Sequence, residues 1–318
     1  FEPDGGGWNN IRMAMESTIG LAIAMGRTLV MPPQKRMYLL GKGDKDQQKH
    51  FSFADFFPIY EMAKEFEEQH AGGSGAGFKV ISMEEYLKRQ AMTGKLRHKE
   101  TGQVAFPPGN RTNWDGIAQK EYDELRGYLR NVTYLPLWKP GSCLPAFPSS
   151  RNNNNKDVAG LQELLRQARS NNNIPEGTPP VDVTDPNPLG RLEETLSGRK
   201  SLCVYDEELQ SQTALHFQCN HKAKLRMLVH FYAFLFFESW TEDMWMKRFI
   251  RDHVRYIDEI QCAAARVVAG IRDHVRKRSG DPHGTFDTFH IRRGDFQFKT
   301  TRISAQEIYE NSKTELTP

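Results

Sequence analysis

The stretch Phe286-Asp-Thr-Phe-His-Ile-Arg-Arg-Gly-Asp-Phe-Gln-Phe298 decides how the fold of this chain is interpreted. Its aromatic and β-branched residues are typical of a short buried strand, which Gly294-Asp295 ends. His290, Arg292 and Arg293 are therefore expected where a strand gives way to a loop, the edge of an open α/β sheet at which ligands bind. Guanidinium groups can bind phosphate oxygens bidentately. Taken alone, the string is equally consistent with a solvated turn that holds a local ion pair.

A glycine-rich stretch near the other end of the chain, Glu2-Pro-Asp-Gly-Gly-Gly-Trp-Asn-Asn-Ile-Arg-Met13, favours the ligand-binding interpretation. It leads into an apolar stripe at helical spacing from Asn9 to about Arg27. Residues 28–31 are then predicted to form a buried strand, which two prolines end. If a strand precedes Phe1, these elements form a β-α-β unit with the glycine turn at its ligand-facing end.

Length and composition narrow the class of protein. The 318 residues suffice for two domains or one large one, and the 38% hydrophobic content suffices for a core. The longest apolar run, Phe231 to Phe237, is too short to cross a membrane. The net charge of +3 suits a small anionic ligand but is too scattered for a nucleic-acid surface, so no nucleic-acid partner is expected. Four cysteines leave one or two disulfide bridges possible.

Strand and helix patterns alternate along the rest of the chain, which predicts an α/β fold. The predicted strands are 78–81, 132–135 and 201–205. The predicted helices are 82–90, 115–130, 161–169, 225–240 and 242 to about 278, and a capped helix is expected to begin at Ser304. Two polar segments rich in Asn and Pro, 148–157 and 170–188, are predicted surface insertions.

Two paired motifs resemble the GDP-fucose protein O-fucosyltransferase family. The first is Gly5-Gly-Gly-Trp-Asn-Asn10 before a helix that ends in Gly26-Arg-Thr-Leu-Val-Met-Pro-Pro33. The second is Phe289-His-Ile-Arg-Arg-Gly-Asp-Phe296, which is similar to the family's His-x-Arg-x-Gly-Asp at a strand end. Both occur in the family's order, while residues 34 to 280 match only in general plan.

The resemblance implies a GT-B-like glycosyltransferase with two Rossmann-like domains. Residues 1–280 would form the N-terminal Rossmann-like domain. Residues 281–318 would contain the first strand and helix start of a truncated C-terminal nucleotide-binding domain, most of which would lie beyond residue 318. Residues 1–318 alone are therefore expected to show weak or no activity, because the cleft needs both walls.

The resemblance also assigns roles in the second motif, residue by residue. Arg292 falls on the arginine that holds the diphosphate of GDP-fucose and is the expected catalytic residue. His290 falls on its neighbour in the same pocket. Arg293 stands at a position that varies in the family, and Asp295 is expected to fix the turn. Both are also expected to belong to the substrate-binding residues.

The glycine loop supplies the opposite side of the expected donor site. Asn9 falls on the loop asparagine that faces the donor, and Gly6 and Gly7 let backbone N–H groups approach it. One branch of the family carries a glutamate general base in this loop, and Gly6 stands in its place. Asp4 is then either a substitute base or a loop cap, and the leaving phosphate is another candidate proton acceptor.

The implied reaction is an inverting transfer of fucose from GDP-fucose to a Ser or Thr hydroxyl of a protein. Arg292 would supply the positive charge at the phosphate, so neither a metal nor another cofactor is expected. The alternatives are a glycan acceptor, or a non-catalytic homologue that binds the nucleotide sugar. The family implies the lumen of the endoplasmic reticulum or Golgi, although the chain shows no targeting segment.

The sequence fits two possible metal sites and a dinucleotide site less well than it fits a nucleotide-sugar site. Asp44-Lys-Asp46 could be a metal-binding pair, but a lysine-rich loop favours solvated carboxylates. The spacing in His216-Phe-Gln-Cys-Asn-His221, with Cys203, matches no tetrahedral zinc site. The glycine loop lacks the third glycine and the downstream acidic residue of a dinucleotide fingerprint, which argues against a dehydrogenase.

Overall fold

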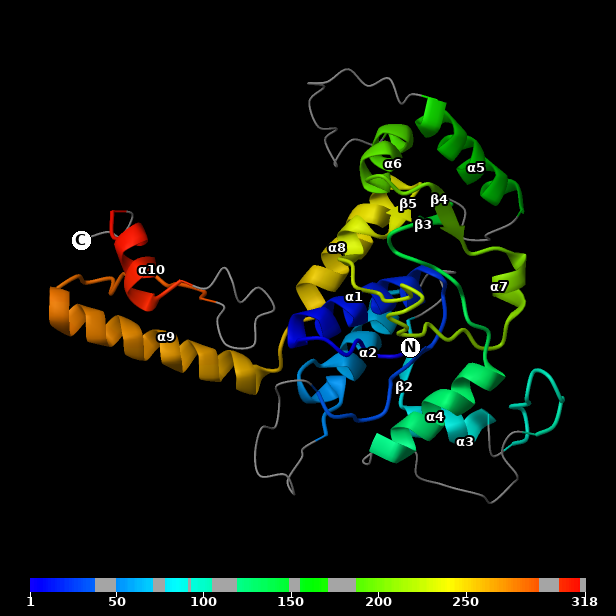
Figure 1. Ribbon diagram of the computed structural model, residues 1–318, viewed down its shortest axis with the longest axis horizontal. Coiled ribbons are helices and arrows are strands. Elements are labelled where there is room, and N and C mark those ends of the chain that lie inside the picture. The colour runs from blue at the N-terminus through cyan, green and yellow to red at the C-terminus, as the bar shows by residue number, and fades with distance from the viewer. Residues whose placement is uncertain are drawn as a thin grey trace. The chain divides into compact units, whose positions relative to one another are not determined.

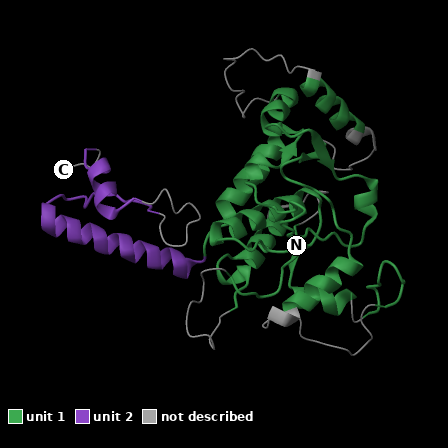
Figure 2. Cartoon of the chain, in the orientation of Figure 1, with its two compact units in different colours: residues 1–256 green, residues 257–318 purple. Residues whose placement is uncertain are grey.

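The computed structural model describes residues 1–37, 50–70, 78–90, 93–104, 119–148, 155–170, 187–291 and 303–314. The chain divides into two compact units, Phe1–Tyr256 and Ile257–Pro318 (Figure 2). The domain boundary near residue 280 stays a prediction. None of the described helices combines the length and the apolar character that crossing a bilayer requires.

Helices and short strands alternate along the first unit (Figure 1). Their order is α1 (Trp8–Ala24), β1 (Leu29–Val30), η1 (Phe53–Asp55), α2 (Ile59–His70), β2 (Val80–Ile81), α3 (Met83–Gln90), α4 (Gln119–Val132), β3 (Cys143–Phe147), α5 (Asn155–Ser170), α6 (Pro188–Leu196), β4 (Ser201–Val204), α7 (Glu207–Ser211), η2 (Phe231–Ala233), β5 (Phe236–Phe237) and α8 (Trp240–His253). The second unit contains α9 (Asp258–Ser279) and α10 (Ala305–Ser312).

All strand pairs in the described residues are parallel, as helix crossovers between strands require. β1 pairs with β2, and a second sheet has the order β4-β3-β5. The strands predicted at 28–31, 78–81 and 201–205 are confirmed as β1, β2 and β4. The mixed α/β class is therefore confirmed, while the GT-B arrangement of two Rossmann-like domains stays a prediction.

Helix α1 is central to the core of the first unit. Its apolar stripe, which includes Ile11, Met15 and Ile19, is almost fully buried, as the helical spacing predicted. At Gly20 the helix packs so closely that an added Cβ would lie 2.4 Å from Leu235 Cδ1. This close packing fixes the helix that carries the glycine loop at its N-terminal end.

Two predicted helix and strand boundaries are wrong in the first unit. The strand predicted at 132–135 does not form, because Val132 ends α4 and the Thr133 hydroxyl donates to the Leu129 carbonyl at 2.6 Å. Only Tyr134 forms a bridge, with Leu215. The helix predicted at 161–169 lies inside the longer α5.

The predicted helices at 225–240 and 242–278 are also corrected. Residues 225–230 are not helical, and η2 and β5 follow, because a run of buried aromatic side chains also suits a strand that is covered on both faces. The second predicted helix divides into α8 and α9. Between them the chain leaves the helical path, and the Tyr256 hydroxyl accepts a hydrogen bond from Trp8 Nε1 at 2.8 Å. A tertiary contact therefore overrides the local helical pattern.

The second unit contains the start of the stretch that the fold prediction rested on. Residues 286–291 pair with no other strand in the described part of the chain, and the side chains of Phe289 and Ile291 are 51% and 47% exposed. The predicted buried strand is thus wrong for these residues: no neighbouring strand takes up their backbone hydrogen bonds, and the side chains of Phe289 and Ile291 are exposed. The predicted capped helix at Ser304 is confirmed as α10, where Ser304 Oγ accepts from Glu307 N.

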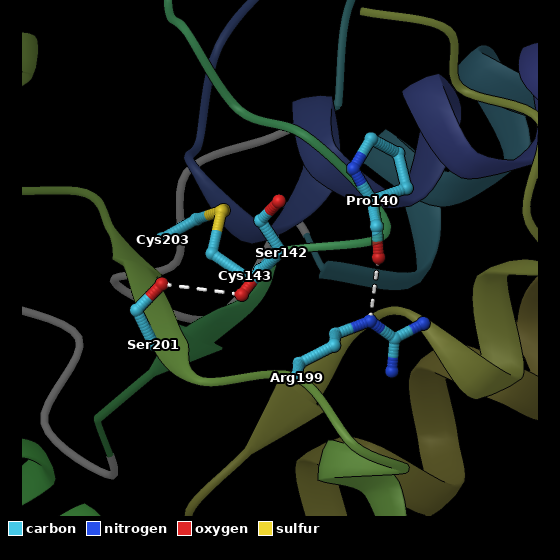
Figure 3. The surroundings of a disulfide bond; sticks show 6 residues. All are labelled: Pro140, Ser142, Cys143, Arg199, Ser201 and Cys203. Carbon is cyan, nitrogen blue, oxygen red and sulfur yellow. Dashed lines mark hydrogen bonds between the residues drawn. A yellow bond between two sulfur atoms is a disulfide. The ribbon is translucent and has the colours of Figure 1, made fainter. Parts of the chain in front are cut away.

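A disulfide joins neighbouring strands of the second sheet (Figure 3). It links Cys143 of β3 to Cys203 of β4, with the Cα atoms 5.3 Å apart. Beside it, Arg199 Nε donates to the Pro140 carbonyl at 2.6 Å and Ser201 Oγ to the Ser142 carbonyl at 3.3 Å. Several of the sequence-based predictions fall outside the described residues: the Asp44–Asp46 pair, Asp115 and most of both polar insertions.

Candidate active site

The predicted site residues divide between the two units. Arg292, Arg293 and Asp295 lie outside the described residues. His290 is described and is exposed on the segment that follows α9. The contribution of the second motif therefore stays a prediction, and the geometry of the site rests on the glycine loop of the first unit.

Gly5, Gly6 and Gly7 lead directly into α1, as the sequence predicted. The Gly7 carbonyl accepts from Asn10 N at 2.9 Å and Ile11 N at 3.2 Å, which begins the helix. No side chain caps this end of α1, and its first turn contains no acidic residue. No side chain therefore competes with an anion at this end of the helix, where the helix dipole also favours negative charge. Asn9 is exposed at this end of the helix.

Asp4 is buried directly before the glycine loop, with 1% of its surface exposed. Arg226 donates to it through Nε and Nη2, both at 2.8 Å, and Gly6 N donates at 2.7 Å. Although burial opposes the charged form, the hydrogen bonds from Arg226 and Gly6 hold the pKa of Asp4 below its usual 3.8. Because a carboxylate with a lowered pKa takes up protons weakly, this geometry favours the loop cap over the general base.

A second buried carboxylate stands on the other side of Pro3. Glu2 is 7% exposed and accepts from Arg130 Nε and Nη2 at 2.7 and 2.8 Å. Cys219 N also donates to Glu2, at 3.2 Å, and His216 Nε2 lies 3.4 Å from Glu2 Oε1. The segment that leads into the glycine loop is thus held by two carboxylate–arginine forks.

A side chain at position 6 would collide with two neighbouring side chains in their present positions. A Cβ on Gly6 would lie 2.6 Å from Asn10 Nδ2 and 2.9 Å from Asp4 Oδ1, closer than real Cβ atoms approach other atoms. The glutamate that the family resemblance placed here in one branch therefore could not be accommodated without moving Asn10 or Asp4.

One group of side chains near the loop has the composition of a metal site. Asp4, Cys219 and His221 offer ligand atoms within 4.8 Å of one another. However, Arg226 already donates to both oxygens of Asp4, and burial raises the pKa of the Cys219 thiol, which opposes the thiolate that a metal needs. The group therefore fits a cation poorly.

A cavity of about 330 Å³ lies at the other end of α1. Its lining includes Leu21, Met25, Val30, Leu215 and Phe217, and none of the loop glycines. Its walls are mainly apolar, and it lies beside the C-terminal half of α1. We therefore do not assign the nucleotide sugar to it.

The buried His216 side chain should make the stability of the fold depend on pH. Burial, followed by nearby positive charge such as that of Arg130, lowers the pKa of His216 well below 6.5. Well above pH 6.5 the histidine is neutral in both the folded and the unfolded state, so it does not change the free energy of unfolding. As the pH falls below 6.5, the unfolded state gains the proton first, so the free energy of unfolding should fall by about 1.4 kcal/mol per pH unit from this group.

Denaturant unfolding of wild type and His216→Gln at pH 7.5 and pH 5 measures this effect. We expect a smaller loss of stability between these pH values in the variant. His274→Gln, which removes an exposed histidine, is the matched control and should keep the wild-type dependence. An unchanged pH dependence in His216→Gln would contradict the assignment.

Glu2, Arg130, His216 and Arg226 were not among the predicted site residues. Each carboxylate stands next to Pro3, but its arginine is 128 or 222 positions away. Only the charges of Glu2 and Asp4, beside a glycine loop, could have indicated that partners were needed.

Comparison with models of known protein families identifies the family of the chain. The family model described as O-FucT, GDP-fucose protein O-fucosyltransferase, matches residues 1–318. No curated protein and no solved structure matches the chain. The family match covers both the glycine loop, with its described geometry, and the arginine motif. The chain therefore belongs to the GDP-fucose protein O-fucosyltransferase family.

Proposed function

We propose that this protein transfers fucose from GDP-fucose to a Ser or Thr hydroxyl of a protein acceptor, with inversion at C1 of the sugar. The family itself implies a GDP-fucose-dependent fucosyltransferase that acts on protein. The observation that carries the finer proposal is the glycine loop, whose backbone amides at the start of α1 are free of side-chain caps. A GT-B-like pair of Rossmann-like domains would place this loop opposite the arginine motif.

The donor would be held from both sides. Arg292 would bind the diphosphate, with His290 beside it. Asn9 and the amide of Gly7 would face the donor from the first unit, while the Gly6 amide is held by Asp4. As the bond between C1 of fucose and the β-phosphate oxygen breaks, negative charge grows on that oxygen. A positioned guanidinium binds this charge more tightly in the transition state than in the ground state, so the scheme needs no metal.

The acceptor hydroxyl must also lose its proton. Gly6 carries no acid, and Asp4 is engaged by Arg226. We propose that the bond from C1 to the phosphate oxygen breaks early and that the sugar gains positive charge, so that the hydroxyl oxygen bonds to C1 from the opposite face as GDP departs. The hydroxyl proton then leaves late and reaches the departing phosphate through solvent, because inversion keeps the two groups on opposite faces of the sugar.

The endoplasmic reticulum or Golgi lumen is the proposed location. The Cys143–Cys203 disulfide supports it, because disulfides persist in oxidising compartments and are rare where thiols are kept reduced.

Calorimetric titration of the intact protein with GDP-fucose, GDP and UDP tests the donor assignment. We expect both guanosine ligands to bind and UDP to bind far more weakly. A transfer assay would then offer protein domains and free glycans as acceptors, with alkaline β-elimination to detect fucose on Ser or Thr. Transfer only to glycans would favour that acceptor class, and binding without GDP release would favour a non-catalytic homologue. Equal binding of UDP would contradict the proposal.

A further inference from the structure

We infer that Asp4, through Arg226, is a positioning residue that fixes the glycine loop in the shape in which it meets the donor. This inference rests on the proposed function and deepens it, because it names the group that holds the loop side of the same site. Asp4 itself need not touch the substrate.

The contacts of Asp4 join the loop to a distant part of the chain. Gly6 N donates to Asp4 Oδ1, which also accepts from Arg226 Nη2, and Arg226 Nε donates to Oδ2. A carboxylate buried to this degree persists as an ion only when it is paired and hydrogen-bonded. The bidentate fork meets that requirement and fixes the orientation of the carboxylate as well as its charge.

The loop needs such a support, because three successive glycines have few intrinsic constraints on their backbone. At Gly5 and Gly7, a Cβ would have no neighbouring atom within 4 Å, so no group packs against the Cβ side of these two residues. The cap position Gly7 receives no side-chain hydrogen bond. Among the described residues, the bond from Gly6 N to Asp4 is the side-chain contact that holds the amide of the middle glycine.

Glu2 provides a matched comparison two residues away. It is also buried and also held by a bidentate arginine. Its other donor is Cys219 N, and it accepts no hydrogen bond from the three loop glycines. Loss of Glu2 should therefore destabilise the unit without releasing the loop, whereas loss of Asp4 should do both.

The test compares Asp4→Asn, Arg226→Lys and Glu2→Gln in the intact protein. Asparagine keeps the shape of Asp4 but offers one oxygen to the three N–H donors, and lysine keeps the charge of Arg226 without the fork. We expect Asp4→Asn to raise the KM for GDP-fucose ~10-fold or more while the KM for the acceptor stays unchanged, because small displacements of a binding loop are costly. Arg226→Lys should give an intermediate increase. Glu2→Gln should lower Tm with the donor KM unchanged.

Hydrogen exchange of the peptide that covers residues 5–10 gives a readout that is independent of turnover. It should exchange ~10-fold faster in Asp4→Asn and at the wild-type rate in Glu2→Gln. If wild type is active but Asp4→Asn and Glu2→Gln have the same donor KM and the same exchange rate as each other, the positioning role alone is overturned. A wild type that neither binds nor turns over GDP-fucose would overturn the proposed function and this inference with it. If Asp4→Asn fails to fold, Arg226→Lys decides by the same measurements.

Discussion

Replacing Arg292 with alanine should lower the turnover of GDP-fucose by ~10²–10³-fold, the loss typical of a single preorganised donor at a developing negative charge. The reason is that the guanidinium interacts most strongly with the β-phosphate oxygen when the bond to fucose is nearly broken. Arg292→Lys retains the charge but cannot bind two oxygens at once, so its turnover should fall between those of wild type and alanine. Steady-state kinetics with saturating acceptor measure both.

Arg251→Ala is the matched control for this experiment. It removes an exposed guanidinium of α8 whose ion pair is with the adjacent Asp252, so turnover should be unaffected. Thermal unfolding of each variant separates loss of catalysis from loss of folding. If folded Arg292→Ala keeps turnover within ~10-fold of wild type, Arg292 is not the group that stabilises the leaving phosphate.

Removal of the Cys143–Cys203 disulfide should cause the second large effect. The bridge spans a sequence separation of 60 residues, and the chain-entropy model gives about 4 kcal/mol of stabilisation for a loop of this length. In a unit of this size that corresponds to a decrease in Tm of roughly 10 °C. Calorimetry of the double variant Cys143→Ala/Cys203→Ala measures this decrease in Tm. Wild type in a strong reductant should have a Tm close to that of the variant.

Cys262→Ser supplies the control, because Cys262 is a free, exposed thiol on α9. It should leave Tm unchanged in oxidising buffer. A double alanine variant with the Tm of wild type would show that hydrogen bonding between β3 and β4 holds the two strands without covalent help.

Local sequence patterns predicted correctly those elements whose pattern fits only one type of secondary structure. The stripe through Ile11, Met15 and Ile19 predicted α1, and Ser304 predicted the start of α10. The pattern failed near residues 234–237, because contiguous buried aromatics fit both a helix and a fully covered strand. Position in the sheet, beside β3, decided the outcome there. Such competition is settled by tertiary contacts that a local window does not contain.

The candidate site was predictable to a similar extent. The motif predicted the turn through Gly6 and Gly7 that leads into α1, because a glycine turn before a helix is a local feature. The roles of Gly6, Gly7 and Asn9 at the donor stay predictions. It could not identify Arg226 as the partner of Asp4. That pairing depends on how the chain before η2 returns to the glycine loop, and nothing in the residues around position 226 indicates it.

The crowding around Gly6 has an implication for enzyme engineering. An attempt to convert this protein to the branch with a loop glutamate, by one substitution at position 6, would require the side chains of Asn10 and Asp4 to move away from the new Cβ. Asn10 can turn its flexible side chain, but the Asp4 carboxylate is held by Arg226 and by the Gly6 amide. The substitution would therefore act against the hydrogen bonds that fix the loop.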